Sequence, residues 1–485
     1  MNLKLTRPLS KLPESYFWTL DHSTNWVLDE PGIYNFGCDN RYLKKPETYI
    51  EDYKRLTDLC SDIGIKGILI WGFLRDSHGG VEYARRVASY GASKGVCIIA
   101  GVGTTWYGGP YYDGIHRYNL ETFLSVNPNA HIKNQDQWWT EEDFRKHGAC
   151  PSKPVYREWI YEGLDWLFRE FEIGGVSFEN GDFSVCRCPE CSIFMADRPQ
   201  DEPEFYSYQY LGYKEALGSI KRLKGQIGNR LVTWATYTGF MPGNPHSEYD
   251  KTAFLHCQKP SIFDRLEDPE ITQWTLSGML LEKPLPLDSY LDNGSPEEAF
   301  DNPKWPSGLY PPSQRGVGFA HQGSQWMENR YDQVVSSIKE ACLRAYRSGL
   351  EGVVIHGEVN SRHIPSALNY LAFSHFTHWP EDTLRDFGKK TLGEIFNNEH
   401  EGEKYAEIFS RWDSGTLTKD DFIQSADVWK DLEKYTFRGN TLDFESNLTR
   451  IRFWYWLRVM LSKQNKYEDK YVFRKPQDRH TVSYI

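Results

Sequence analysis

Two acidic residues stand at the end of a short apolar run near the middle of the chain. Glu179 and Asp182 follow the segment from Gly175 to Phe178 and are separated by Asn180-Gly181, a dipeptide that favours a tight turn. Cleavage of a glycosidic bond requires one protonated carboxyl as general acid and a second carboxyl as base or nucleophile. We therefore expect Glu179 to act as the general acid and Asp182 to tune it. In the alternative, Asp182 only caps the turn and Glu179 pairs with a basic neighbour.

Two further acids are candidates for the second carboxyl. Glu358 follows the apolar run Val353-Val-Ile-His-Gly, and Asp21 stands beside His22 after another apolar run. We expect Glu358 or Asp21 to be the base or nucleophile. If Glu358 lies across the site from Glu179 with room for a water, inversion of the sugar centre is favoured, whereas a short separation would indicate a covalent route. A structural hydrogen bond to the rim would equally explain Glu358.

Polar and aromatic residues near the other strand ends are candidates for holding a sugar, because a flat ring with a polar tip suits its mixed surface. Aromatic residues make up 15% of the chain. Core packing explains most of them, and lone histidines in loops are more often surface residues. The predicted substrate-binding residues are His22, Trp71, Trp106, His131, His147, Trp234, Tyr237, His321, Gln322, Trp326 and Asn360.

Three cysteines directly follow the acidic turn. Cys186, Cys188 and Cys191 have a spacing that suits thiolate ligation of zinc, and Cys150 is the candidate fourth ligand. Four protein ligands would leave no position for a reacting water, so such a zinc would be structural. The alternative is a set of free or redox-sensitive thiols. We expect no cofactor to be required for catalysis.

Short runs rich in Val, Ile and aromatic residues alternate with helical patterns, which is typical of parallel βα units. The predicted strands are Tyr16 to Leu20, Gly67 to Trp71, Val96 to Val102, Gly175 to Phe178, Leu231 to Ala235, Ile271 to Leu276, Gly316 to Ala320 and Gly352 to His356. The predicted outer helices are Pro46 to Ile63, Val81 to Lys94, Pro154 to Phe171, Phe205 to Ile227, Tyr331 to Leu350 and Pro365 to Phe376.

Eight such units predict an α/β fold, a (β/α)8 TIM barrel over residues 1–380, whose reactive groups gather at the carboxyl ends of the strands. Two long βα loops, 103–153 and 280–315, are expected to be functional. After Pro380 the pattern changes to charged amphipathic helices without strand signals. Residues 381–485 are therefore predicted to form a helical region packed on the barrel.

Composition limits the partners that we expect. The net charge of −11 argues against nucleic acid as a partner. The sequence contains no 18-residue apolar span, so no membrane segment is expected. Nine cysteines in a long chain and no visible signal peptide favour a cytoplasmic location, although export stays open if the sequence is trimmed. No dinucleotide fingerprint, phosphate loop or nucleophile elbow is found. The oligomeric state is left open, with a homodimer as one option.

With these acids after strand four, the chain resembles barrel glycoside hydrolases of the broad group that contains hexosaminidase-like and alpha-glucuronidase-like enzymes. The resemblance covers residues 10–380 in layout. It implies a carbohydrate substrate and a glycosidase, which we expect to be exo-acting, with an acidic residue after strand four as Glu179 and Asp182 stand here.

Two alternatives remain open. The chain also resembles barrel sialidases with an Asp and His catalytic pair, which implies an inverting exo-sialidase using Asp21 with His131 or His147. The arginines that would then bind a sugar carboxylate are Arg75, Arg117, Arg145 and Arg187. In the second alternative the barrel binds carbohydrate without catalysis, and its acids only accept hydrogen bonds from hydroxyl groups.

Overall fold

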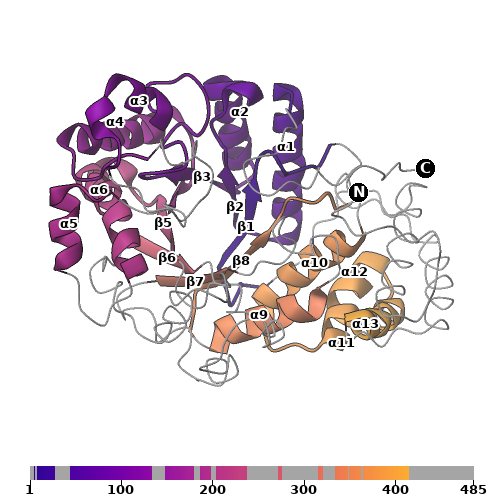
Figure 1. Cartoon of the computed structure of the whole chain (residues 1–485). Helices are drawn as coiled ribbons and strands as arrows, with labels where there is room; N and C mark the ends of the chain where they lie inside the picture. Colours follow the sequence, from indigo (N-terminus) through magenta and orange to yellow (C-terminus); the bar gives the residue numbers. More distant parts are fainter. Residues whose placement is uncertain are drawn as a thin grey trace, which may run out of the picture.

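The protein is an α/β barrel of parallel strands (Figure 1). The computed structural model describes residues 5, 8–27, 44–133, 148–179, 186–197, 204–236, 271–275, 315–319, 334–347, 349–361 and 364–413. Each strand pairs in parallel with the next in sequence, and β8 pairs with β1, so the ring of strands is closed. The strands are β1 (Glu14–Leu20), β2 (Gly67–Trp71), β3 (Cys97–Gly103), β4 (Gly175–Glu179), β5 (Leu231–Thr236), β6 (Ile271–Thr275), β7 (Arg315–Phe319) and β8 (Gly352–His356). All eight predicted strands are confirmed within one or two residues.

Alternation along each strand separates two buried layers. In β1, Trp18 belongs to a cluster inside the barrel, whereas Phe17 packs in the larger core between strands and helices. The same alternation places Val354 of β8 inside and Val353 outside. A residue's position along its strand therefore decides whether it lies inside the barrel or beneath the helices.

Helices follow the strands as the apolar spacing predicts. Proline begins both α1 and α4, where its missing N–H costs nothing, and Gly64 ends α1 with a left-handed φ of 78°. The principal barrel helices are α1 (Pro46–Ile63), α2 (Gly80–Ser93), α4 (Pro154–Glu170), α6 (Glu204–Ile227), α9 (Val335–Arg347) and α10 (Ile364–His378). Shorter helices are η2 (Asp76–His78), α3 (Leu120–Val126), η3 (Pro128–Ala130) and α5 (Pro189–Ala196).

The described chain after residue 380 is helical. Thr383 and Asp386 form a capping box at the start of α11. These elements are α11 (Leu384–Phe387), η8 (Gly388–Leu392), α12 (Gly393–Phe396) and α13 (Glu399–Asp413). Figure 1 draws them in orange and yellow beside α9 and α10, and α13 contacts α9. The boundary at residue 380 stays a prediction, and residues 414–485 lie outside the described chain.

Among the described residues, no helix combines the length and apolar character needed to cross a membrane.

Candidate active site at the carboxyl ends of the strands

Glu179 is the last residue of β4 and belongs to the face of that strand that points into the barrel. Its neighbours Val176 and Phe178 lie in the outer core, so alternation turns Glu179 inward. Its side chain is buried, and its carbonyl oxygen accepts a hydrogen bond from Thr104 N at 3.1 Å. The sequence position and the strand register together place this carboxyl at the carboxyl end of the barrel, where βα loops build catalytic sites.

Glu358 lies after β8, which stands four places from β4 in the ring of eight strands. The two strands therefore lie on opposite sides of the barrel, as expected. Glu358 is fully buried, and its Oε1 accepts hydrogen bonds from Leu20 N at 2.8 Å and Ser23 Oγ at 2.7 Å. These contacts agree with the alternative interpretation of Glu358, in which it makes structural hydrogen bonds to the rim.

Aromatic rings line the interior near the ends of β1, β2 and β8. Trp71 is only 3% exposed, and its ring centroid lies 6.1 Å from that of Tyr107 and 6.3 Å from that of Tyr112. Trp18 packs edge-on against His356 at 4.8 Å. Trp71 thus lies where the sequence placed it, at the inner end of β2.

The two half-buried tyrosines beside Trp71 were not among the predicted binding residues. Tyr107 has a φ of 59°, which is unusual for a residue with a large side chain, and Gly108 and Gly109 follow it with positive φ. This sharp backbone path brings the Tyr107 ring to Trp71. The Tyr-Gly-Gly sequence was the available signal, because consecutive glycines permit such a turn.

Asp21 lies beneath the helices rather than inside the barrel. Thr19 points outward and contacts Tyr53 of α1, and the alternation carries on to Asp21, which is completely buried. One oxygen, Oδ2, lies 3.0 Å from Arg75 Nε and 2.6 Å from His78 Nδ1, while Oδ1 lies 3.3 Å from Arg75 Nη2. His22 Nδ1 is 3.5 Å from Oδ1.

These contacts correct the expectation that Asp21 acts as base or nucleophile, because Arg75 and His78 occupy both of its oxygens on the helix side of the barrel wall. Burial alone would raise the pKa of Asp21, but the charges of Arg75 and His78 and hydrogen bonds from His22 and His78 lower it well below its usual value. Burial lowers the pKa of His78, although Asp21 opposes this effect. Asp21 is an ionised anchor for the loops after β1 and β2.

The same network removes support for the sialidase alternative. Arg75 binds Asp21 and Asp113 instead of offering its guanidinium to a sugar carboxylate. Arg117 pairs with Glu162 at the surface at 2.6 Å. The half-buried His131 forms an isolated backbone bridge with Ala149, while His147 and Arg145 lie outside the described chain.

Three predicted binding residues have structural positions instead. Trp234 faces outward from β5, is fully buried, and packs edge-on against Tyr213 of α6 at 5.5 Å. Trp106 is 4% exposed and packs beside the cysteines after β4. Asn360 donates from Nδ2 to the carbonyl oxygen of Trp26 at 2.7 Å, and it is also buried. The Trp234 prediction is wrong because the alternation along β5 turns this ring, like Val232, toward the helices.

The following predicted site residues lie outside the described residues: Asp182, His147, Tyr237, His321, Gln322 and Trp326.

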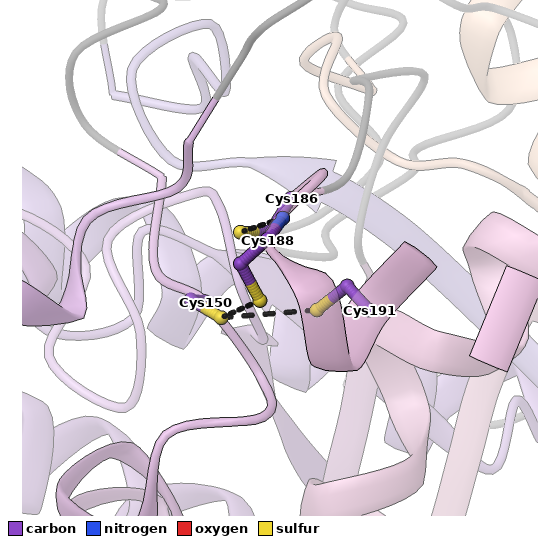
Figure 2. Close-up of side chains that lie close together, drawn as sticks. All are labelled: Cys150, Cys186, Cys188 and Cys191. Atoms are coloured by element: carbon purple, nitrogen blue, oxygen red, sulfur yellow. Dashed lines mark hydrogen bonds between the residues drawn. The ribbon is translucent and has the colours of Figure 1, made fainter. Parts of the chain in front are cut away.

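The four cysteines proposed as zinc ligands come together from two loops. Cys150 lies before α4, whereas Cys186, Cys188 and Cys191 lie around the start of α5 (Figure 2). All four side chains are buried, and their sulfurs lie within 4.8 Å of one another. Hydrogen bonds with Cys150 and Cys191 lower the pKa of the Cys186 thiol. The spatial cluster that the spacing predicted is therefore present.

No protein-family model and no curated protein matches the sequence. Solved structures with similar architecture include a GH138 enzyme targeting pectin rhamnogalacturonan II, at 10% identity and a TM-score of 0.47 over 95% of this chain and 60% of that one. An alpha-amylase from Geobacillus thermoleovorans has 10% identity and a TM-score of 0.45 over 77% of this chain and 80% of that one. A GH20 exo-beta-N-acetylglucosaminidase from Vibrio harveyi has 10% identity and a TM-score of 0.43 over 83% and 58%, respectively. The chain thus spans about 60% of the length of the GH138 enzyme.

Proposed function

We propose that the protein is a glycoside hydrolase in which Glu179 is the general acid. The observation that carries the proposal is the inward-facing carboxyl at the end of β4, opposite the carboxyl that follows β8. A carboxyl at this end of a parallel barrel stands where substrate is bound in enzymes of this architecture. A buried carboxyl is also suited to hold the proton that a leaving oxygen needs.

Aromatic groups around Trp71, at the same end of the barrel, support a sugar as the substrate. Trp71 ends β2, and Tyr107 and Tyr112, from the loop that follows β3, pack against it; all three rings have polar tips. Such rings stack on the apolar faces of a pyranose while their polar atoms bind its hydroxyl groups. We assign substrate contact to Tyr107 and Tyr112 in particular, because both are half-buried rather than buried.

The second carboxyl in this proposal is Glu358, with Asp182 tuning Glu179. Leu20 N and Ser23 Oγ fix the direction of the Glu358 carboxyl, which suits a group that must hold one position during the reaction. Exo action is part of the same proposal. The long segment 104–153 between β3 and α4 supports it, since long βα loops can close one end of a site.

The substitution Glu179→Gln tests the role of the general acid. It should lower kcat/KM about 10²- to 10⁴-fold on glycosides whose leaving group needs protonation. On aryl glycosides with strongly acidic leaving groups the loss should be small, since those groups depart unprotonated. The matched control is Glu172→Gln, because Glu172 is exposed and precedes β4 at the other end of the strand.

The substrate class is tested with a panel of aryl glycosides and reduced oligosaccharides. Monosaccharide release from one end would support exo action, and internal cleavage would contradict it. Sugar binding by calorimetry without any turnover would contradict the enzyme proposal and favour the carbohydrate-binding barrel. An equal loss of activity on all leaving groups in Glu179→Gln would show that Glu179 does not donate the proton.

A further inference from the structure

Two sulfur–sulfur distances in the buried cysteine cluster match those of a metal–thiolate site, and all four sulfurs lie within 4.8 Å of one another. Cys150 Sγ lies 3.7 Å from Cys188 Sγ and 3.8 Å from Cys191 Sγ (Figure 2). Tetrahedral zinc with Zn–S bonds of about 2.3 Å separates its sulfurs by about 3.8 Å. A disulfide would need about 2.05 Å, and all four cysteines are free thiols. The described chain thus already holds the sulfurs at ligand spacing.

We propose that Cys150, Cys186, Cys188 and Cys191 bind one Zn²⁺ as a closed tetrathiolate site. Cysteine sulfurs alone form the ligand set, which favours zinc over harder cations such as magnesium or calcium. Four protein ligands leave no coordination position for water, so the ion is structural. Burial of all four side chains agrees with such a role.

Donors around the sulfurs are arranged to stabilise the negative charge that four thiolates and one Zn²⁺ would carry. The backbone N–H groups of Lys133 and Cys188 point at Cys186 Sγ, at 3.3 Å and 3.4 Å. Ser152 Oγ lies 3.0 Å from Cys191 Sγ. Outer groups of this kind orient ligands and tune a metal centre. They are a second observation, independent of the sulfur spacing, that points to bound thiolates.

The site would join the two loops on either side of Glu179. Cys186 follows Glu179 by seven positions, whereas Cys150 belongs to the loop that precedes α4. Two backbone hydrogen bonds connect the cysteine cluster to Glu179. Ala149, which precedes Cys150, donates from N to Thr105 O at 2.9 Å, and the neighbouring Thr104 donates from N to Glu179 O at 3.1 Å. The zinc therefore anchors the backbone that positions Glu179. Only this last step rests on the proposed function.

Metal content tests the site without any activity measurement. The purified full-length chain should contain one zinc per chain by mass spectrometry of metals, and Co²⁺ in its place should give the intense visible spectrum of a tetrahedral thiolate complex. Cys186→Ser should lose the zinc. Cys342→Ser is the matched control, because Cys342 is a buried free thiol on α9, outside the cluster. Iron instead of zinc, a disulfide among the four cysteines, or zinc retained by Cys186→Ser would overturn the proposal.

A milder pair of variants serves if Cys186→Ser does not fold. Ser152→Ala removes the hydroxyl beside Cys191 and should weaken zinc affinity about 10- to 100-fold in a chelator competition. Ser192→Ala is the control, since its hydroxyl donates to Arg187 O at 3.3 Å and not to a sulfur. Equal zinc affinity in the two variants would overturn the role of Ser152. One zinc per chain in a protein without glycosidase activity would sustain the metal site and refute only the proposed function.

Discussion

The substitution Asp21→Asn distinguishes a structural carboxylate from a catalytic one. In the wild type, Arg75 and His78 surround Asp21 at 3.0 Å and 2.6 Å, and Asp21 is completely buried. The amide keeps the shape of the side chain but removes its charge, so the buried Arg75 guanidinium loses its principal counter-ion. The expected result is a large loss of stability from a substitution that changes few atoms.

Breaking a buried ion pair by removing one partner costs about 3–5 kcal/mol. Arg75 is 15% exposed and keeps Asp113 as a partner, which places the expected cost near 3 kcal/mol. With an unfolding entropy of about 2.1 cal/mol/K per residue, that cost lowers Tm by about 4 °C for a cooperative barrel of this size. Thermal unfolding followed by circular dichroism measures the change.

Asp113→Asn is the matched control, because Asp113 pairs with the same arginine but is 57% exposed. An exposed pair contributes about 1 kcal/mol or less, so its Tm should move by roughly 1 °C. If Asp21→Asn left Tm unchanged but abolished turnover, the structural assignment of Asp21 would be refuted. Equal Tm changes in the two variants would show that the burial of Asp21 does not increase its contribution to stability.

The stability that Asp21 contributes should decrease at low pH. The folded-state pKa of Asp21 lies well below its unfolded value of about 3.9, because nearby positive charge outweighs burial. Its contribution to stability is therefore fully present above that unfolded value and is lost as the pH falls through the folded pKa. The Tm difference between wild type and Asp21→Asn should therefore shrink as the pH falls below about 4, where the unfolded chain takes up the proton that Asp21 does not bind in the folded state.

Two further substitutions test the packing that positions the site. Trp234→Ala should lower the free energy of unfolding by about 3–5 kcal/mol, because its ring packs on Tyr213 beneath α6, and KM of the folded variant should not change. Calorimetry and steady-state kinetics measure these two quantities. A raised KM with unchanged stability would show that Trp234 contacts the substrate. Gly72→Ala should destabilise more than Gly95→Ala; both glycines have positive φ, but an added Cβ at Gly72 would lie 1.9 Å from Asp21 Oδ1 and one at Gly95 meets nothing within 4 Å. Similar melting temperatures for these two variants would contradict a close approach of the β2 loop to Asp21.

Local pattern was enough to predict the strands and the principal barrel helices of this fold, but not the short helices α3 and α5. Pro46 and Gly64 bound the first barrel helix in the sequence and in the structure, because each imposes its backbone preference locally. Short apolar runs before Glu179 and after Gly352 predicted β4 and β8, and their order around the ring followed from successive parallel pairing. The cysteine spacing likewise predicted a cluster, since three of the four residues are close in sequence.

Which residues face the interior could be decided only by the tertiary structure. Asp21 follows the last residue of β1 and Glu179 ends β4, yet alternation turns Asp21 toward α1 and Glu179 toward the barrel interior. A shift of one residue in where a strand ends reverses the face, and sequence-based strand ends are uncertain by at least that much. The partners Arg75 and His78 are more than fifty positions from Asp21 in the sequence, so no local sequence pattern could predict that Asp21 is buried. The chain's own sequence thus determined which groups stand at the strand ends, and three-dimensional packing determined which of them remain available for chemistry.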